Sequence, residues 1–169
     1  MINNEINLDD IHLKYQKLTK FLIDNNLTIT TMESCTSGFI ASLITDTMGA
    51  SNIFKGSFVT YSNDAKISCG VDKKIIDKFG VYSTETSLEM AKACKLKYNS
   101  NIGIGITGTF ANIDVNNFDS ISNLVFFAII YNDLIYNYNI NTDECSNRFE
   151  SKLKVALEVF NSLQTILSF

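Results

Sequence analysis

The order in which helical and strand-like patterns follow one another constrains the fold of this chain more than any other feature. Apolar residues recur at helical spacing over 8–25, and a β-branched run at 27–32 follows. The two patterns alternate as far as residue 106, and two apolar runs near the end are joined by Asn132-Asp133, which suits a hairpin. Alternation favours parallel strands and a hairpin adds antiparallel ones. We therefore expect an α/β fold, a three-layer α/β/α sandwich with a mixed sheet.

The expected elements follow one another without an interruption that would mark a domain boundary. Helices are expected at 8–25, 37–48, 84–98 and 147–167, short helical pieces within 63–79, and strands at 27–32, 53–61, 102–106, 124–131 and 134–140. Neither an internal repeat nor a low-complexity linker separates them. A chain that is 46% hydrophobic can bury a core without metals or disulfides. We therefore expect a single domain over residues 1–169.

Composition and charge argue against several classes of partner and cofactor. The net charge is -4 and the lysines are scattered, so a nucleic-acid partner, which needs a basic patch, is not expected. The four cysteines form no Cys-x-x-Cys pair and the single histidine, His12, is distant in sequence, so no metal site is expected. No signal-peptide pattern is present, and the longest apolar run, 124–131, is too short for a bilayer. We expect a cytoplasmic protein with reduced thiols and no membrane partner.

The segment Glu33-Ser34-Cys35-Thr36-Ser37-Gly38 lies between an expected strand and an expected helix. Its small residues permit a tight turn, and the backbone N–H groups at a helix start favour an anion. A serine placed there, Ser34, can act as a nucleophile that faces a preformed oxyanion hole. Local sequence alone favours a simpler role, in which Ser34 or Thr36 caps the helix. Cys35 has no histidine partner in the sequence, and an inert buried thiol is the commoner case.

A serine nucleophile needs a base, and the residue counts restrict the choice. The only histidine, His12, belongs to the first expected helix and is interpreted as a surface residue, so a Ser-His-Asp triad is nearly excluded. The other common base is a lysine whose pKa is lowered by burial. Lys66 follows the end of an expected strand and can meet Ser34 if the two strands are neighbours, with Tyr61 as a further donor. The alternative, which local sequence favours, is a surface turn with an exposed lysine.

Two further features carry weaker signals. Residues 103–108, Gly-Ile-Gly-Ile-Thr-Gly, match the pattern G-x-G-x-x-G, but they lie within an expected strand and no helical pattern follows them. The better interpretation is a strand whose small residues let another backbone or a ligand approach closely. Arg148 is the only arginine, and its bidentate fork suits a phosphate or a carboxylate. An ordinary surface role in the first turn of the last helix is an equal alternative.

Taken in order, these motifs resemble those of the C-terminal, amidase-type domain of the CinA family. Residues 33–38 are similar to the family's E-S-C-T-G-G, with Ser37 in place of a glycine. The positions that are similar to its F-x-G-x-x-x-T-Y-S-N-x-x-K are Phe54, Gly56, Thr60, Tyr61, Ser62, Asn63 and Lys66, and further matches are Gly70-Val71, Gly80-Val81-Tyr82-Ser83, Met90-Ala91 and Ile106-Thr107-Gly108. Each motif is weak alone, but their shared order over roughly residues 18–160 identifies the chain as a member of the family.

The resemblance implies a three-layer α/β/α domain that hydrolyses the carboxamide of nicotinamide mononucleotide to nicotinic acid mononucleotide and ammonia. It implies a serine nucleophile, Ser34, with Lys66 and Tyr61 nearby. The substrate-binding positions that it implies are Cys35, Thr36, Ser37, Gly38, Thr107, Gly108 and Arg148. No cofactor and no metal are expected. The expected partner is a small-molecule nucleotide substrate, and a homo-oligomer is an open alternative to a monomer.

The chain departs from the family pattern after Gly108. The family continues with a glycine-rich loop, A-G-P-x-G-G, whereas residues 109–117 here contain neither glycine nor proline. Bulkier side chains in this loop would narrow the pocket or change its ligand. Two alternatives to the deamidase therefore stay open, namely a catalytically silent member that binds a nucleotide or a partner protein, and a serine amidase of another small amide.

Overall fold

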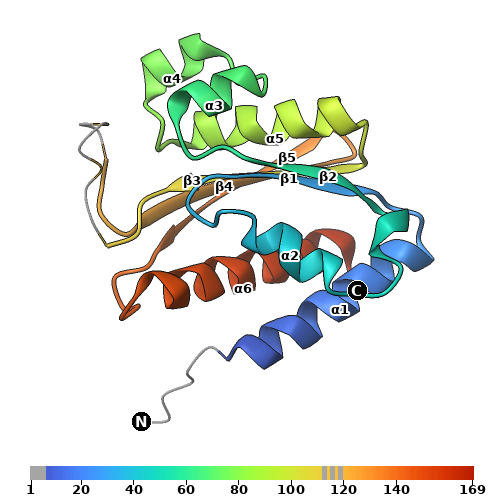
Figure 1. Ribbon diagram of the computed structural model, residues 1–169. Coiled ribbons are helices and arrows are strands. Elements are labelled where there is room, and N and C mark those ends of the chain that lie inside the picture. The colour runs from blue at the N-terminus through green and yellow to red at the C-terminus, as the bar shows by residue number, and fades with distance from the viewer. Residues whose placement is uncertain (1–6, 112–113, 115–116, 118–119) are drawn as a thin grey trace.

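The structure, a computed structural model, describes residues 7–111, 114, 117 and 120–169. Within these residues, five strands form one sheet, which is the middle layer of the molecule (Figure 1). The strands are β1 (Ile29–Glu33), β2 (Phe54–Val59), β3 (Ile102–Gly108), β4 (Leu124–Tyr131) and β5 (Leu134–Asn141), in the order β2-β1-β3-β4-β5. β1 is parallel to β2 and β3, whereas β4 is antiparallel to β3 and β5. The predicted mixed sheet is confirmed.

Helices cover both faces of this sheet (Figure 1). One face carries α1 (Leu8–Asp24), α2 (Phe39–Thr45) and α6 (Arg148–Leu167), and the other carries α3 (Asn63–Ser68), α4 (Lys73–Phe79) and α5 (Thr84–Tyr98). The short 3-10 helix η1 (Ala50–Asn52) leads into β2. The predicted three-layer α/β/α sandwich is therefore confirmed. No helix in the described part of the chain is both long and apolar enough to cross a membrane.

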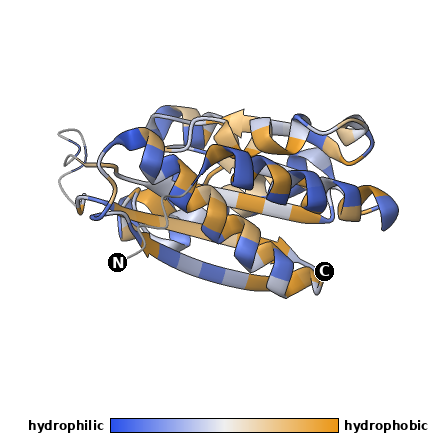
Figure 2. Ribbon diagram, turned by 90° about the horizontal axis from the view of Figure 1, so that it is seen from below, coloured by the Kyte–Doolittle hydropathy of each residue, from blue (hydrophilic) through white to orange (hydrophobic). Residues whose placement is uncertain are grey.

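The larger hydrophobic core lies between the sheet and the layer that contains α1 and α6. Tyr15, Phe127 and Phe160 are almost completely buried in it. The hydroxyl of Tyr15 donates to the carbonyl of Ala156 at 2.9 Å, which satisfies the buried phenol and ties α1 to α6. Figure 2, which views this layer from below, shows hydrophobic and hydrophilic residues interspersed along its helices. This is the amphipathic pattern from which the helices were predicted.

β3 lies so close to α5 that no side chain fits at two of its positions, Gly103 and Gly105. A Cβ atom on Gly105 would lie 2.1 Å from the carbonyl oxygen of Ser87 and 2.5 Å from the backbone nitrogen of Ala91. A Cβ atom on Gly103 would lie 2.6 Å from the carbonyl oxygen of Ala91. Both positions therefore need glycine because another backbone occupies the space. The interpretation of residues 103–108 as a strand with small residues, rather than a dinucleotide-binding loop, is confirmed.

The carboxyl ends of β1 and β2 determine where the candidate site lies. Glu33, the last residue of β1, is opposite Val59, the last residue of β2. The N–H of Thr60 donates to the carbonyl of Glu33 at 2.8 Å, which extends the pairing by one residue. Ser34 and Thr60 therefore leave two neighbouring parallel strands at the same edge of the sheet. In open α/β sheets this is the edge at which ligands bind.

Candidate active site

A sharp turn after β1 brings Ser34 to the edge of the sheet. The N–H of Ser34 donates to the carbonyl of Ile106 at 3.0 Å, and the N–H of Ser37 donates to the carbonyl of Ser34 at 3.0 Å. Ser37 has φ 55° and Gly38 has φ 85°, both in the left-handed region that favours glycine. Ser37 stands where the family motif has glycine, so the turn is kept at a conformational cost of about 1–2 kcal/mol.

The start of α2 is capped by Glu33, a role that the sequence interpretation missed. The Glu33 side chain is fully buried, and its Oε2 accepts from the N–H of Ile40 at 3.2 Å. Its Oε1 accepts from the N–H of Ala41 at 2.9 Å and from the hydroxyl of Thr31 at 3.0 Å. The favoured local prediction, in which Ser34 or Thr36 caps this helix, is wrong because a carboxylate from the preceding strand fills that place. Ser34 is therefore available for another role.

Ser34 and Lys66 form a buried hydrogen-bonded pair. Nζ of Lys66 lies 3.0 Å from Oγ of Ser34 and 2.8 Å from the carbonyl oxygen of Thr60. The exposed fraction is 1% for Lys66 and 5% for Ser34. The short helix α3 makes this possible, because Ser62 caps it by accepting from the N–H of Ala65 at 3.1 Å, and Lys66 then points back toward β1. The alternative of an exposed lysine in a surface turn is wrong.

Burial changes the acid–base properties of Lys66. It lowers the pKa of the lysine from 10.5 to about 8, and the nearby Cys35 and Asp114 act in the opposite direction. Burial raises the pKa of Cys35 to about 12, so this side chain is a thiol and not a thiolate at neutral pH. Asp114 is therefore the charged group that holds the pKa of Lys66 up. A lysine with a pKa near 8 has a neutral fraction large enough to accept a proton from a serine.

The residues next to Ser34 suit an oxyanion hole. Among the described residues, the N–H groups of Cys35 and Thr36 donate to no backbone carbonyl. Both residues directly follow the candidate nucleophile, where backbone donors can face the developing oxyanion. The buried, protonated Cys35 thiol agrees with the interpretation of an inert cysteine.

Tyr61 and Arg148 lie together, outside the Ser34–Lys66 pair. Nη2 of Arg148 donates to the hydroxyl of Tyr61 at 2.9 Å, and Nη1 donates to the carbonyl of Phe110 at 3.0 Å. The Tyr61 side chain is 62% exposed. Among the described residues, no carboxylate forms a salt bridge with Arg148. The structure therefore places the Tyr61 hydroxyl beside a guanidinium group whose hydrogen-bond partners among the described residues are neutral oxygens.

Thr107 and Gly108, predicted to bind substrate, have structural contacts. The hydroxyl of Thr107 is buried and donates to the carbonyl of Val81 at 3.0 Å. Gly108 has φ 155°, and a Cβ atom there would lie 2.5 Å from the carbonyl oxygen of Leu124. Both residues support the end of β3 beside the site, and neither lines the cleft described next.

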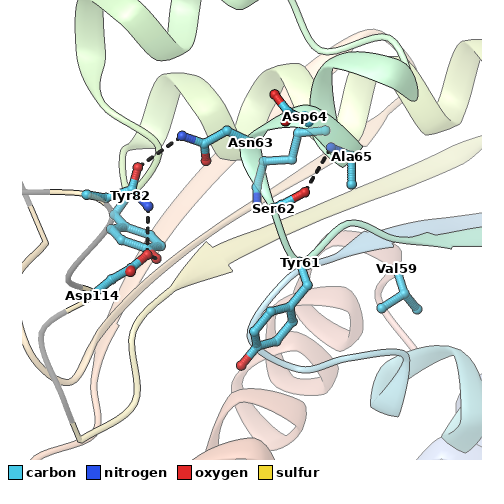
Figure 3. A pocket seen from close by; sticks show the side chains of 10 residues that line it. Val59, Tyr61, Ser62, Asn63, Asp64, Ala65, Tyr82 and Asp114 are labelled. Carbon is cyan, nitrogen blue, oxygen red and sulfur yellow. Dashed lines mark hydrogen bonds between the residues drawn. The ribbon is translucent and has the colours of Figure 1, made fainter.

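A cleft of about 570 Å³ opens next to Lys66 (Figure 3). Its lining consists of Val59, Tyr61, Ser62, Asn63, Asp64, Ala65, Lys66, Tyr82, Asp114 and Asn117. Figure 3 shows Asp114 and Tyr82 close together at one side, with the Tyr61 ring at a separate place. The sequence interpretation gave no site role to Asn63, Tyr82, Asp114 and Asn117, although Asn63 and Tyr82 belong to the motifs quoted for the family. The cleft is large enough for a small nucleotide.

The loop after Gly108, where the sequence departs from the family pattern, contributes to this cleft. Of its residues 109–117, positions 112–113 and 115–116 lie outside the described residues. Phe110 is buried in the main core. Asp114 and Asn117 line the cleft. The altered loop therefore replaces a glycine-rich segment by one that presents a carboxylate and an amide.

The comparison with protein families agrees with the geometry. The model of the CinA C-terminal domain matches residues 13–167. The chain belongs to this family. In this CinA C-terminal domain, Ser34 and Lys66, which form the buried pair, belong to two of the motifs that carry the resemblance.

Relatives and solved structures of CinA proteins agree in sequence and fold. A CinA-like protein of Fervidobacterium nodosum is 44% identical over 102 residues, 60% of this chain and 25% of the relative. A competence-damage inducible protein of Alkaliphilus oremlandii is 35% identical over 85% of this chain and 34% of the relative. The chain thus spans about a quarter to a third of the length of these relatives. The crystal structure of the competence/damage inducible protein CihA of Agrobacterium tumefaciens superposes with a TM-score of 0.83 at 26% identity, covering 92% of this chain and 94% of that one.

Proposed function

We propose that the chain is a serine amidohydrolase that converts nicotinamide mononucleotide to nicotinic acid mononucleotide and ammonia in the cytoplasm. The observation that carries this proposal is the buried contact of 3.0 Å between Nζ of Lys66 and Oγ of Ser34. The resemblance of both motifs to those of nicotinamide mononucleotide deamidases supports the choice of substrate. A cleft that opens at Lys66 provides the room for it.

The proposed reaction proceeds through an acyl-enzyme. Neutral Lys66 accepts the proton of Ser34, whose Oγ attacks the carboxamide carbon. The N–H groups of Cys35 and Thr36 stabilise the oxyanion of the tetrahedral intermediate. Lys66 returns the proton to the leaving nitrogen, and ammonia departs as the acyl-oxygen bond to Ser34 remains. Water, deprotonated by Lys66, then hydrolyses the ester to the carboxylate product and restores the serine.

A direct assay tests this function. Purified protein is incubated with nicotinamide mononucleotide, and ammonia release is followed beside the Ser34→Ala variant. Release by the wild-type protein well above that of the variant is the expected result. Equal release by the two would reject the deamidase. It would favour one of two alternatives motivated by the altered loop: a catalytically silent member that binds a nucleotide or a partner protein, or a serine amidase that acts on another small amide.

The activity should depend on pH through Lys66. Only the neutral lysine is a base, so kcat/KM is expected to rise about tenfold per pH unit below the pKa of about 8 and to level off above it. Replacing Asp114 by asparagine removes the carboxylate that raises this pKa, and the rising part of the profile should move to lower pH. Initial rates at low substrate concentration between pH 6 and about 10 measure both effects. A profile that is flat across this range would exclude Lys66 as the base.

Arg148 should act on binding of the phosphate. Its guanidinium has neutral partners only among the described residues, and charge-assisted bonds to a phosphate are worth about 1.5–3 kcal/mol. Arg148→Met is therefore expected to raise KM for the mononucleotide by about 10- to 100-fold. Nicotinamide riboside, which lacks the phosphate, should be hydrolysed equally by both proteins. Lys152→Met, on the same helix, is the matched control, and a loss shared by both substrates would contradict the assignment.

A further inference from the structure

The altered loop places a carboxylate, that of Asp114, at the wall of the cleft. The hydroxyl of Tyr82 donates to Oδ2 of Asp114 at 2.5 Å, and Nδ2 of Asn117 donates to the same oxygen at 2.6 Å. Nδ2 of Asn63 donates to Oδ1 of Asn117 at 3.0 Å, which connects this group to the helix that carries Lys66. The side chains of Tyr82 and Asn117 thus hold Asp114 directly, and Asn63 holds Asn117 in turn. A carboxylate that is fixed in this way presents its charge at a defined place.

The charges that line the cleft favour a cation over an anion. Among its described lining residues, Lys66 is the single base, whereas Asp64 and Asp114 are both acids. Asp64 is exposed and screened by solvent, but Asp114 is part-buried and acts on Lys66. Burial and the hydrogen bond to Asp114 raise the pKa of Tyr82, so its phenol stays neutral. The aromatic ring beside a carboxylate offers a further attraction for a cation.

We propose that Asp114 and Tyr82 form a subsite for the positively charged ring of an N-substituted pyridinium carboxamide. The subsite selects such a ring over a neutral amide of the same shape. The inference rests in part on the proposed function, because it identifies the substrate class of the same cleft. The selection depends on the negative charge of the Asp114 carboxylate, and it does not require a free hydrogen-bond acceptor on that carboxylate.

The same charge helps the product to leave. Hydrolysis replaces the neutral carboxamide by a carboxylate, which carries the same sign as Asp114. The ring that Asp114 attracts therefore arrives with a neutral substituent and departs with an anionic one. Repulsion between the new carboxylate and Asp114 weakens product binding relative to substrate binding.

Binding of two small probes tests the subsite without requiring turnover. The 1-methylnicotinamide cation and neutral nicotinamide are titrated by calorimetry into the Ser34→Ala protein, which prevents hydrolysis during the measurement. We expect the cation to bind about tenfold more tightly than nicotinamide, as one close charge pair provides. Adding Asp114→Asn should remove most of this preference and leave nicotinamide binding unchanged. Adding Asp64→Asn, the matched control at the exposed acid, should leave the preference intact.

The outcomes separate this subsite from the proposed activity. If Asp114→Asn leaves the affinity for the cation unchanged, the proposal is overturned. It is also overturned if the affinity for both probes falls equally, because that result indicates a purely structural role. Salt gives a second measurement on the protein with Asp114 in place, because the preference for the cation should shrink as sodium chloride is raised. A preference that is insensitive to salt would also overturn it. If the preference follows Asp114 but no ammonia is released in the assay, the subsite stands and the deamidase does not.

Discussion

Replacing Ser34 by alanine is expected to lower the rate of deamidation by about 10³-fold or more, and Lys66→Met should have a similar effect. The alanine variant lacks the oxygen to which the proposed mechanism attaches the acyl group. The methionine variant keeps the length of the buried side chain but has no nitrogen to accept the proton of Ser34 at 3.0 Å. Because the proposed mechanism uses the two residues as one unit, the double variant should be little slower than either single variant. Single-turnover rates with nicotinamide mononucleotide measure all three.

Matched control variants show whether these rate losses come from the catalytic step or from the substitutions as such. Ser42→Ala changes an exposed serine on α2, and Lys92→Met changes an exposed lysine on α5 that pairs with Glu89. Both should retain the wild-type rate. A double variant whose loss equals the product of the two single losses would show that Ser34 and Lys66 act independently. That result would contradict the proposed pair.

Gly105→Ala should be the most destabilising single-methyl change in the sheet. The added Cβ atom would lie 2.1 Å from the carbonyl oxygen of Ser87, and a backbone atom cannot move aside as a side chain can. Overpacking of this kind costs about 3 kcal/mol, so the free energy of unfolding should fall by that amount. The melting temperature should fall by about 6–12 °C for a chain of this length. Urea unfolding and a thermal melt measure the two quantities.

Gly70→Ala is the comparison variant, because it adds backbone strain without the steric clash expected for Gly105→Ala. A Cβ atom on Gly70 would meet Ala93 at an ordinary 3.5 Å, but the residue has φ 103°. Its replacement should therefore cost only the strain of the left-handed backbone, about 1–2 kcal/mol. If Gly70→Ala proved as damaging as Gly105→Ala, the close approach of α5 to β3 would not be the reason for glycine in β3.

Much of the fold was predictable because local signals and tertiary packing agree. Ser83 caps α5 as predicted, with its hydroxyl accepting from the N–H of Thr86 at 3.1 Å. Asn132 and Asp133 adopt positive φ values of 49° and 61° at the hairpin turn, which their short polar side chains tolerate. Periodicity also placed the long helices within a residue or two. These features depend on neighbours in the sequence, which is why the sequence alone was sufficient.

The candidate site was only partly predictable because its contacts join distant residues. The contact between Ser34 and Lys66 was expected only on the condition that their strands are neighbours, which the sheet order satisfies. The capping role of Glu33 was missed because its acceptors serve N–H groups seven and eight residues later. Asp114 was missed because no local pattern indicates that a loop carboxylate reaches Tyr82, 32 residues earlier. Tyr61 was expected near Lys66, and both line the cleft, but the hydrogen bond between the Tyr61 hydroxyl and Arg148 was not foreseen.

The acceptor that orients Lys66 is the main-chain carbonyl of Thr60, and no substitution at residue 60 can delete it. The Thr60 hydroxyl is buried and has no hydrogen-bond partner among the described residues, so the side chain contributes little that valine would not. What fixes the lysine is thus the path of the backbone at the end of β2. A family member with another residue at this position can therefore still hold its lysine in the same orientation. A sequence pattern that requires threonine there would miss such a member.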